Sequence, residues 1–253
     1  MADISYVMTY FNNPRMMDVH LATWHTYSEE AKEAIAFIVV DDCSTIPLNI
    51  EYANLNLTVL RIKDDITWNL PGARNLGAHY CKTPWFFMTD TDMLLSSAAA
   101  DNLLVLPMDN PKTIWNLKHR GITPECIKVG HCANHILLSK ELFWNCWGYD
   151  EDFSGSYGGQ EGHLRSKLFR EGGERYMAKD VIMHNFGENY QPPVILDAKC
   201  STDEMKTDEG LKRARKISAD LYHSRSRLMV DKKWNQNVLR FEWEVVQEFT
   251  FSK

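Results

Sequence analysis

Short runs of apolar residues recur along the first half of the chain and predict β-strands. They cover residues 4–10, 36–40, 57–62, 85–89 and 113–117. Stretches with the spacing of amphipathic helices lie between several of these runs. Such alternation is typical of βαβ units, in which helices cover a mostly parallel sheet. The pattern therefore predicts an α/β fold.

Two helices in the same half are predicted from the positions of proline and from apolar spacing. Proline suits the first turn of a helix, so the first helix is expected to begin near Pro14. Its residues Met17, Leu21 and Trp24 then share one face. The second helix is expected to begin at Pro71, which again follows a strand-like run.

The spacing of the elements changes after about residue 120. We expect a strand over residues 130–138, a helix over 139–147, a glycine-rich turn over 155–159, a helix over 161–171 and a strand over 177–183. Glycine and prolines then indicate a loop over residues 185–193. From about residue 207 the chain is charged with helical spacing, and residues 238–251 are aromatic and amphipathic.

Composition and charge narrow the class of protein. The chain has 253 residues, 44% of them hydrophobic, which is enough for the core of one large domain. A formal net charge of −6 argues against a general nucleic-acid binder. No apolar stretch approaches the roughly 20 residues of a transmembrane helix, and the amino terminus lacks the pattern of a signal peptide. The six cysteines form no C-x-x-C pair, which favours free thiols in a reducing compartment. We therefore expect a soluble, cytoplasmic protein.

Two acids lie at the end of the apolar run at residues 85–88. Asp90 and Asp92 are separated only by Thr91, so at the end of a strand both carboxylates face the same side. The carboxyl edge of a parallel sheet is where α/β folds bind ligands, and two carboxylates there suit a divalent metal bound to a phosphate. An ordinary turn after a strand is the alternative interpretation, because Asp is common in turns.

Six sequence fragments give this pair a context. In chain order they are YVMTYFN (6–12), VVDDCST (39–45), PGARNLG (71–77), FFMTDTD (86–92), GYDEDF (148–153) and GGQEGHL (158–164). Their order and spacing resemble family 2 glycosyltransferases of the GT-A fold, over roughly residues 4–190. That family transfers a sugar from a nucleotide-sugar donor, usually with Mn²⁺ or Mg²⁺. The resemblance implies a Rossmann-like, mixed and mostly parallel sheet flanked by helices.

The resemblance also implies an organisation of the chain. Residues 1–195 would form the glycosyltransferase domain, with a nucleotide-binding half over 1–95 and an acceptor and catalytic half over 96–195. Residues 196–253 would form a helical C-terminal extension packed on the same domain.

The donor site is assigned by resemblance to residues at the ends of the first strands. These are Thr9, Tyr10, Phe11, Asn12, Asp42, Arg74, Asp90 and Thr91. The aromatic residues among them are also candidates for core packing, and only one of the adjacent Asp41 and Asp42 can face the ligand, since they point to opposite sides of an extended chain. Arg74 either contacts the donor or pairs with an acid and holds it in place.

The metal and the catalytic base are assigned in the same way. Asp92 is expected to bind the metal directly, and Asp90 to reach the ribose, or the metal through water. His184, at the end of the last predicted strand, is expected to complete the metal shell, and an imidazole suits Mn²⁺ better than Mg²⁺. Glu161 is the expected base that deprotonates the acceptor hydroxyl. The family usually has two adjacent acids here, whereas this chain has Gln160 before Glu161.

The sequence thus predicts a metal-dependent, inverting glycosyltransferase that moves a sugar to a hydroxyl of a carbohydrate or glycoconjugate acceptor. A UDP-sugar is favoured over a GDP- or TDP-sugar as donor. A retaining glycosyltransferase, a nucleotidyltransferase and a non-catalytic nucleotide-sugar-binding module are the alternatives. The donor sugar, the acceptor and the oligomeric state stay open.

Overall fold

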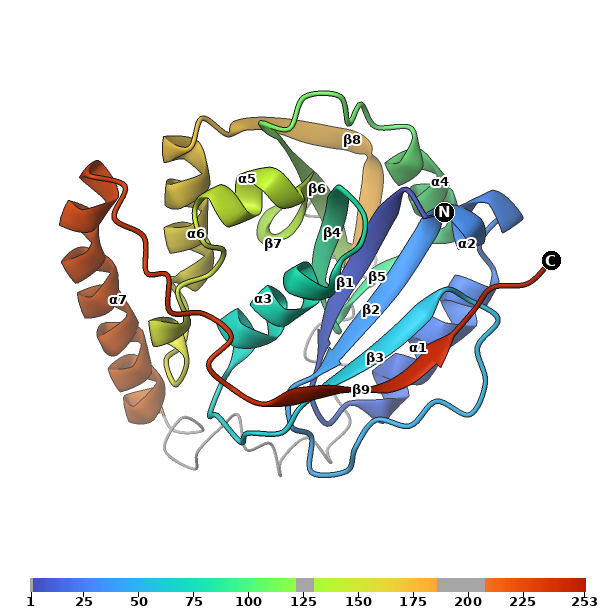
Figure 1. The fold of residues 1–253 in the computed structure, drawn as a ribbon, viewed down its shortest axis with the longest axis horizontal. Helices are drawn as coiled ribbons and strands as arrows, with labels where there is room; N and C mark the ends of the chain where they lie inside the picture. The colour runs from blue at the N-terminus through green and yellow to red at the C-terminus, as the bar shows by residue number, and fades with distance from the viewer. Residues whose placement is uncertain (1, 122–129, 186–207) are drawn as a thin grey trace.

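A nine-stranded sheet forms the centre of the molecule, with helices on both of its faces (Figure 1). The computed structural model describes residues 2–121, 130–185 and 208–253. The strand order is β5-β8-β6-β7-β4-β1-β2-β3-β9. The strands are β1 (Ile4–Tyr10), β2 (Ile35–Asp41), β3 (Leu57–Ile62), β4 (Trp85–Asp90), β5 (Met93–Leu95), β6 (Thr113–Gly121), β7 (Gly130–Ser139), β8 (Glu174–Asn185) and β9 (Trp243–Phe249). The helices are α1 (Pro14–His25), α2 (Glu29–Ala34), α3 (Leu70–Tyr80), α4 (Ser97–Leu104), α5 (Lys140–Asn145), α6 (Gln160–Arg170) and α7 (Asp208–Val230), with a 3₁₀ turn η1 (Glu151–Phe153).

Four parallel strands, β4-β1-β2-β3, form the middle of the sheet. Each is a nearly continuous apolar run because each is covered on both faces, as the sequence pattern predicts. Their carboxyl ends meet at one edge, where Thr9 of β1 pairs with Asp90 and Tyr10 pairs with Asp41. The other half of the sheet is mixed, since β7 runs antiparallel to both β4 and β6, and β5 runs antiparallel to β8. The predicted mixed α/β fold is confirmed.

The two faces of the sheet bury separate cores. On one face, α1, α2 and α4 contribute Met17, Trp24, Ala31 and Leu103 to a cluster with alternate residues of the strands. On the other face, α3, α5 and α6 contribute a second cluster, which includes residues such as Leu164. Figure 1 shows α7 outside α6, at the end of the molecule remote from α1 and α2.

Local sequence signals explain where several helices begin. The Asn13 side chain accepts a hydrogen bond from the Met16 amide, 3.2 Å away, directly before the predicted start of α1 at Pro14. Ser28, Ser96 and Ser139 cap α2, α4 and α5 in the same way. α3 can lie close to β1 because residue 77 is glycine; a Cβ there would stand 2.3 Å from the Val7 side chain.

The C-terminal part of the chain differs from the helical extension predicted for it. α7 is helical, but residues 243–249 form β9, which pairs antiparallel with β3 at the edge of the sheet. Trp243, Gln247 and Phe249 are half-buried, while the other positions of the strand are exposed. This is the pattern of an edge strand, and its aromatic, amphipathic sequence resembles a helix over so short a span.

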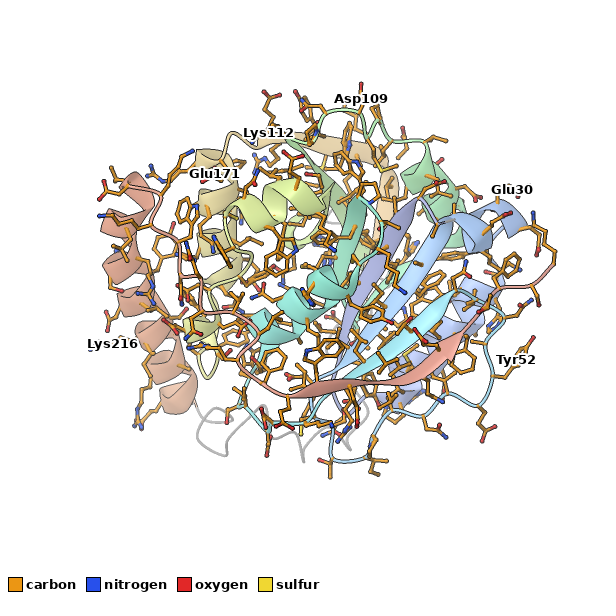
Figure 2. The ribbon with its side chains drawn as sticks, in the orientation of Figure 1. Glu30, Tyr52, Asp109, Lys112, Glu171 and Lys216 are labelled. Atoms are coloured by element: carbon orange, nitrogen blue, oxygen red, sulfur yellow. The ribbon has the colours of Figure 1, made fainter. Side chains whose placement is uncertain are left out.

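Several sequence expectations concern the surface, the cysteines and the location of the protein. Charged side chains such as Glu30, Asp109 and Lys216 project from the periphery in Figure 2. Among the described cysteines, Cys43, Cys81 and Cys146 are not in disulfide bonds. No helix in the described part of the chain is both long and apolar enough to cross a membrane. The predicted loop after residue 185 and the predicted domain boundary at residue 195 lie outside the described residues, and the predicted division into halves and the cytoplasmic location stay predictions.

Candidate active site

Acidic residues collect where the central parallel strands end. Asp41 ends β2 and Asp90 ends β4, on the two sides of β1. Asp42 follows β2, and its amide donates to the Tyr10 carbonyl, 2.9 Å away. Because parallel strands present their carboxyl ends together, these acids lie along one edge of the sheet.

The adjacent acids Asp41 and Asp42 have different surroundings. Asp41 accepts hydrogen bonds from the amides of Ser44 (2.9 Å) and Leu48 (3.1 Å) and pairs with Arg61 at 2.5 Å, so it anchors the loop after β2. Asp42 is 9% exposed, and its Oδ1 has no hydrogen-bond partner among the described residues. Burial and the charge of Asp41 raise the pKa of Asp42 to about 7, although Asn69 lowers it in part. Asp42 is therefore the acid of the two with an oxygen left to accept a hydrogen bond from a ligand.

Arg74 connects the acids of the site. Its side chain is fully buried in α3, and its guanidinium pairs with Asp90 and lies 3.4 Å from Glu161 Oε1. It also donates to the Tyr149 hydroxyl at 2.8 Å. Burial opposes the charge of Arg74, but Asp90, Tyr149 and Glu161 outweigh burial and raise its pKa. Of the two roles expected for Arg74, the structure shows the pairing with acids.

Asn75, the next residue of α3, fixes the segment that carries Tyr149. Its side chain donates to the Tyr149 carbonyl (3.0 Å) and accepts from the Tyr149 amide (2.8 Å), and it also donates to Glu151. Gly148 has a φ of +57°, and a Cβ there would lie 2.5 Å from Asn75 Oδ1. Only glycine allows this approach, so the motif at residues 148–151 serves to bring Tyr149 to Arg74.

Glu161 lies in the first turn of α6. Its side chain is 14% exposed, and Oε1 faces Arg74 while Oε2 has no partner among the residues described. Gln160, which replaces the first acid of the family pattern, is 4% exposed and turned into the protein. Glu161 is therefore the residue of these two that is available to a substrate.

The surroundings of Asp90 and Asp92 shift the pKa values of these two acids in opposite directions. Burial alone would raise the pKa of Asp90, but Arg74, His135 and Asn134 hold it below its usual value. Burial and the charge of Asp90 raise the pKa of Asp92 to about 6, despite smaller opposing contributions from its own amide and Arg74. A cation beside Asp92 would stabilise the charged form of its carboxylate.

His184 reaches the same region through the sheet. It pairs with Leu94 of β5, two residues after Asp92, so β5 and β8 bring the two predicted metal ligands to neighbouring strands. Among residues 2–121, 130–185 and 208–253, no group of three or more His, Cys, Asp or Glu side chains is placed to hold a metal ion. A cation at Asp92 would thus take further ligands from His184, from water or from the phosphates of a substrate.

The predicted donor residues at the end of β1 are used partly by the fold. The side chain of Tyr10 is 3% exposed and packs in the core. Burial and the charge of Asp41 raise the pKa of Tyr10 to about 12. Phe11 and Asn12 are half-buried, and Asn12 joins the two loops through hydrogen bonds with Thr45.

Thr9 and Thr91 hold the two motifs together. Thr9 is 9% exposed, and its carbonyl accepts a hydrogen bond from the Thr91 hydroxyl at 2.5 Å. The Thr91 carbonyl in turn lies 2.8 Å from Nε2 of the buried His20. Burial lowers the pKa of His20 to about 4, which keeps the ring neutral. His20 therefore supports the Asp90–Asp92 turn from below as a neutral hydrogen-bond donor.

The acids that follow Tyr149 are bound by the C-terminal segment. Asp150 accepts from Arg225 (2.8 Å) and Asn235 (2.7 Å), and Asp152 pairs with Arg225 and with Arg240. Glu151 is 2% exposed and accepts from the Leu239 amide at 2.7 Å and the Arg240 amide at 3.3 Å. We call these contacts the C-terminal clamp: Asp150, Glu151 and Asp152 with Arg225, Asn235, Leu239 and Arg240. Its acids are occupied by protein donors.

Known proteins resemble this chain in structure rather than in sequence. No protein-family model matches the chain, and no curated protein matches it. The catalytic domain of Drosophila β1,4-galactosyltransferase 7, in complex with xylobiose, has a TM-score of 0.53 at 12% identity, covering 76% of this chain and 74% of that one. GalNAc-T7 with UDP, GalNAc and Mn²⁺ has a TM-score of 0.60 at 13% identity, covering 93% and 55%. S. aureus TarS 1-349 in complex with UDP has a TM-score of 0.59 at 16% identity, covering 89% and 73%.

The fold is that of the GT-A glycosyltransferases. Within this GT-A fold, the structure brings Arg74, Asp90 and Glu161 into direct contact, although they lie on three elements far apart in the sequence.

Sequence reasoning missed several side chains of the candidate site. Asn134 donates to Asp90 Oδ2 at 3.2 Å, and His135 lies 3.0 Å from the Thr89 hydroxyl. Tyr149 is buried and bonds to Arg74. None of these follows a local motif that marks it, except Tyr149, which belongs to the GYDEDF fragment.

Proposed function

We propose that this protein is a metal-dependent glycosyltransferase of the family 2 type, which transfers a sugar from a nucleotide-sugar donor to a hydroxyl acceptor with inversion. The observation that carries the proposal is the single buried Arg74 that contacts both Asp90 and Glu161. This arrangement joins the predicted donor acid to the predicted base. It suits a reaction in which a base must stand next to a donor's reacting carbon.

In the proposed reaction Glu161 acts as the general base. Its Oε2 accepts the proton of the acceptor hydroxyl, while the acceptor oxygen forms a bond to the anomeric carbon. The bond from that carbon to the nucleotide diphosphate breaks on the opposite face, and the diphosphate leaves with the electron pair. Arg74 holds the Glu161 carboxylate through Oε1 and keeps the other oxygen directed to the substrate.

The donor would be held at the carboxyl edge of the central strands. Asp42 offers a buried, unpartnered oxygen to the base or ribose, and Asp90 would hold the ribose. Asp92 with His184 would hold Mn²⁺ or Mg²⁺, which neutralises charge that develops on the leaving diphosphate. UDP is the favoured nucleotide because the compared structures of TarS and GalNAc-T7 contain UDP, and Mn²⁺ accompanies it in GalNAc-T7.

A screen of nucleotide sugars by thermal shift tests the proposal. We expect at least one UDP-sugar to raise the melting temperature in Mn²⁺ and to lose that effect in EDTA, because a ligand that binds only the native state stabilises it. If no nucleotide sugar gives a metal-dependent shift, the proposal is wrong. NMR of the anomeric configuration of a transfer product then distinguishes inversion from retention.

A further inference from the structure

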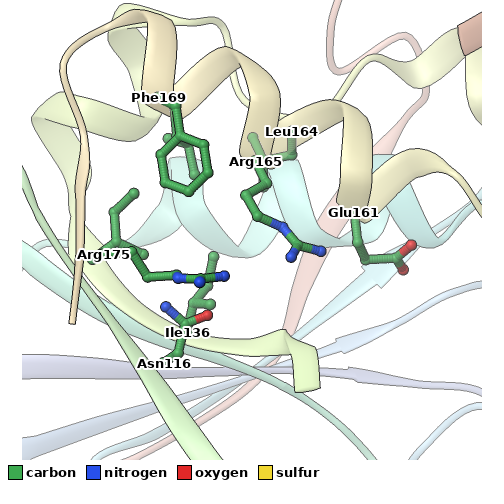
Figure 3. Close-up of a pocket in the computed structure, with 9 residues that line it drawn as sticks. Asn116, Ile136, Glu161, Leu164, Arg165, Phe169 and Arg175 are labelled. Atoms are coloured by element: carbon green, nitrogen blue, oxygen red, sulfur yellow. The ribbon is translucent and has the colours of Figure 1, made fainter. Parts of the chain in front are cut away.

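A narrow pocket opens beside Glu161, between α6 and the sheet (Figure 3). Its polar lining comprises Glu161 and Arg165 from α6, Asn116 from β6 and Arg175 from β8. In Figure 3 the guanidinium groups of Arg165 and Arg175 extend from the helix and from the sheet into the space above Asn116. Nothing in the reaction described above uses these three residues.

Three side chains of α6 lie in a row along the helix side of the pocket. Glu161, Arg165 and Phe169 are four residues apart, so they share one face of α6. The Arg165 side chain is half-buried and makes no ion pair within the described residues. The Phe169 ring is 43% exposed at the outer end of the row. An arginine and an aromatic ring therefore follow the proposed base along the helix.

The sheet side contributes a buried donor without a partner. Asn116 is 2% exposed, and its Nδ2 has no hydrogen-bond partner among the described residues. Asn116 pairs in register with Ile136, and Asn134, two residues before Ile136 on the same face of β7, bonds to Asp90. The pocket is thus one step along this face from the donor acids. Leaving a buried amide unpaired is costly, and a ligand that accepts from it would remove that cost.

Apart from Glu161, the polar groups of the pocket are mainly hydrogen-bond donors. Arg165 and Arg175 carry two positive charges. Guanidinium groups bind carboxylates and phosphates through parallel hydrogen bonds, and the amide Nδ2 adds a neutral donor. A neutral sugar hydroxyl would use these charges poorly. The chemistry of the pocket therefore favours an anion.

We propose that this pocket binds a carboxylate or phosphate group of the acceptor, held by Arg165, Arg175 and Asn116, while a hydroxyl of the same acceptor lies at Glu161. The inference rests on the proposed function, because it makes Glu161 the base. One helical turn, about 6 Å of rise over four residues, separates Arg165 from Glu161. The anionic group is therefore on the acceptor sugar that reacts or on its immediate neighbour, and Phe169 offers a ring face to that sugar.

Binding of three small probes tests the inference directly. Methyl β-glucoside, methyl β-glucuronide and glucose 6-phosphate are titrated into the full chain with UDP and Mn²⁺, and dissociation constants are measured by NMR. We expect at least one anionic probe to bind about tenfold more tightly than the glucoside, because charged hydrogen bonds replace neutral ones. The glucuronide identifies a carboxylate site and glucose 6-phosphate a phosphate site.

Variants on the same helix and on the sheet separate this pocket from general surface charge. Arg165→Gln and Arg175→Gln should each remove most of the preference for the anionic probe, because each replaces a charged guanidinium with a neutral amide. Arg170→Gln, an exposed position of α6 outside the pocket, should keep it. The inference is overturned if neither anionic probe binds better than the glucoside, or if Arg170→Gln loses as much preference as Arg165→Gln.

The same experiment distinguishes failure of the inference from failure of the proposed function. A metal-dependent thermal shift with a UDP-sugar, without any preference for anionic probes, rejects only the acceptor pocket. A preference for anionic probes without any effect of nucleotide sugars rejects the glycosyltransferase and leaves an anion-binding pocket.

Discussion

Two groups of carboxylates lie next to each other in this molecule and differ in what binds them. Asp90 and Glu161 share Arg74; Asp90 also accepts from Asn134 through its second oxygen, whereas Glu161 keeps Oε2 without a partner among the described residues. Glu151 and the other acids of the C-terminal clamp are bound on both oxygens by side chains and backbone amides of the C-terminal segment.

The protein partners of each carboxylate indicate which of these acids can act on a substrate. Hydrogen bonds from protein donors to both oxygens of a carboxylate favour its charged form and lower its pKa, so it is a weaker base than a carboxylate with one oxygen left without a protein partner. Asp150, Glu151 and Asp152 are further acids near Arg74, but their contacts show that they hold the C-terminal segment. Glu161 differs because one of its oxygens has no protein partner in the described structure.

The largest expected effect is on catalysis, at Glu161. Glu161→Gln should lower the transfer rate by at least about 100-fold, because the amide cannot accept the acceptor proton. The thermal shift with the donor should persist, and the free energy of unfolding should change little. Steady-state transfer measured beside donor binding checks this, and retained turnover would move the base to another residue.

The next prediction concerns Arg74, the buried cation that Asp90 and Glu161 share. Arg74→Met should lower the free energy of unfolding by about 3–5 kcal/mol, since it leaves Asp90 and Glu161 without their buried cation. Arg74→Lys keeps the charge and should cost less, although it cannot reach Asp90, Tyr149 and Glu161 together. Urea unfolding of both variants provides the measurement. Equal stability of Arg74→Met and the native chain would contradict the role given to this ion pair.

Glu151 is the matched control for Glu161 in the clamp. Glu151→Gln should lower the free energy of unfolding by about 2–3 kcal/mol, because its amide nitrogen would replace one acceptor oxygen and face either the Arg240 amide or the donors of Asn75 and Leu239. The transfer rate of the folded fraction should stay close to the native rate. A large loss of transfer with unchanged stability would assign a chemical function to Glu151 and remove the distinction between the two groups.

The smallest expected effect concerns pH and the clamp side of α6. His163 packs against Phe153 and Tyr222, and burial together with the charge of Lys167 lowers its pKa to about 4. An unfolded histidine titrates near pH 6.5, so at lower pH the unfolded chain binds the extra proton and the native state loses stability. Between pH 6 and pH 5 this one group should lower the free energy of unfolding by roughly 1 kcal/mol.

The measurement is urea unfolding at both pH values, with His163→Gln as the comparison. The variant should show the smaller loss between pH 6 and pH 5, because it cannot bind the proton. An identical loss in both proteins would mean that His163 keeps its ordinary pKa in the fold.

Much of the central sheet can be predicted from the sequence because fully buried strands have a strong signal. β1 and β3 end where the apolar runs at residues 4–10 and 57–62 end. β9 could not be predicted in the same way, because an edge strand buries few of its residues and its partner β3 lies far away in the sequence. Its pairing is a tertiary property.

The candidate site could likewise be predicted from the sequence only where local pattern determines the position of a side chain. Alternation along the chain separated Asp41 from Asp42, and Asp41 indeed anchors its own loop. The contact of Arg74 with Glu161 could be expected only in general terms, since α3 and α6 meet through the fold. Asn134 and His20 carry no local signal, because their function comes from the neighbours that the sheet and α1 bring to them. The identities of metal and donor residues stay predictions for the experiments above.

The position of β9 has a consequence for synthesis of the protein. Its register pairs Leu57 with Phe249, so a ribosome releases β3 long before the strand that covers it. During that interval β3 presents an uncovered edge, which is a template for pairing with other chains. The clamp on Glu151 is likewise absent from the nascent chain until residues 239 and 240 have emerged. Maturation of the site therefore waits for synthesis of residues 239–249, and the yield of active protein depends on how the nascent chain is protected until then.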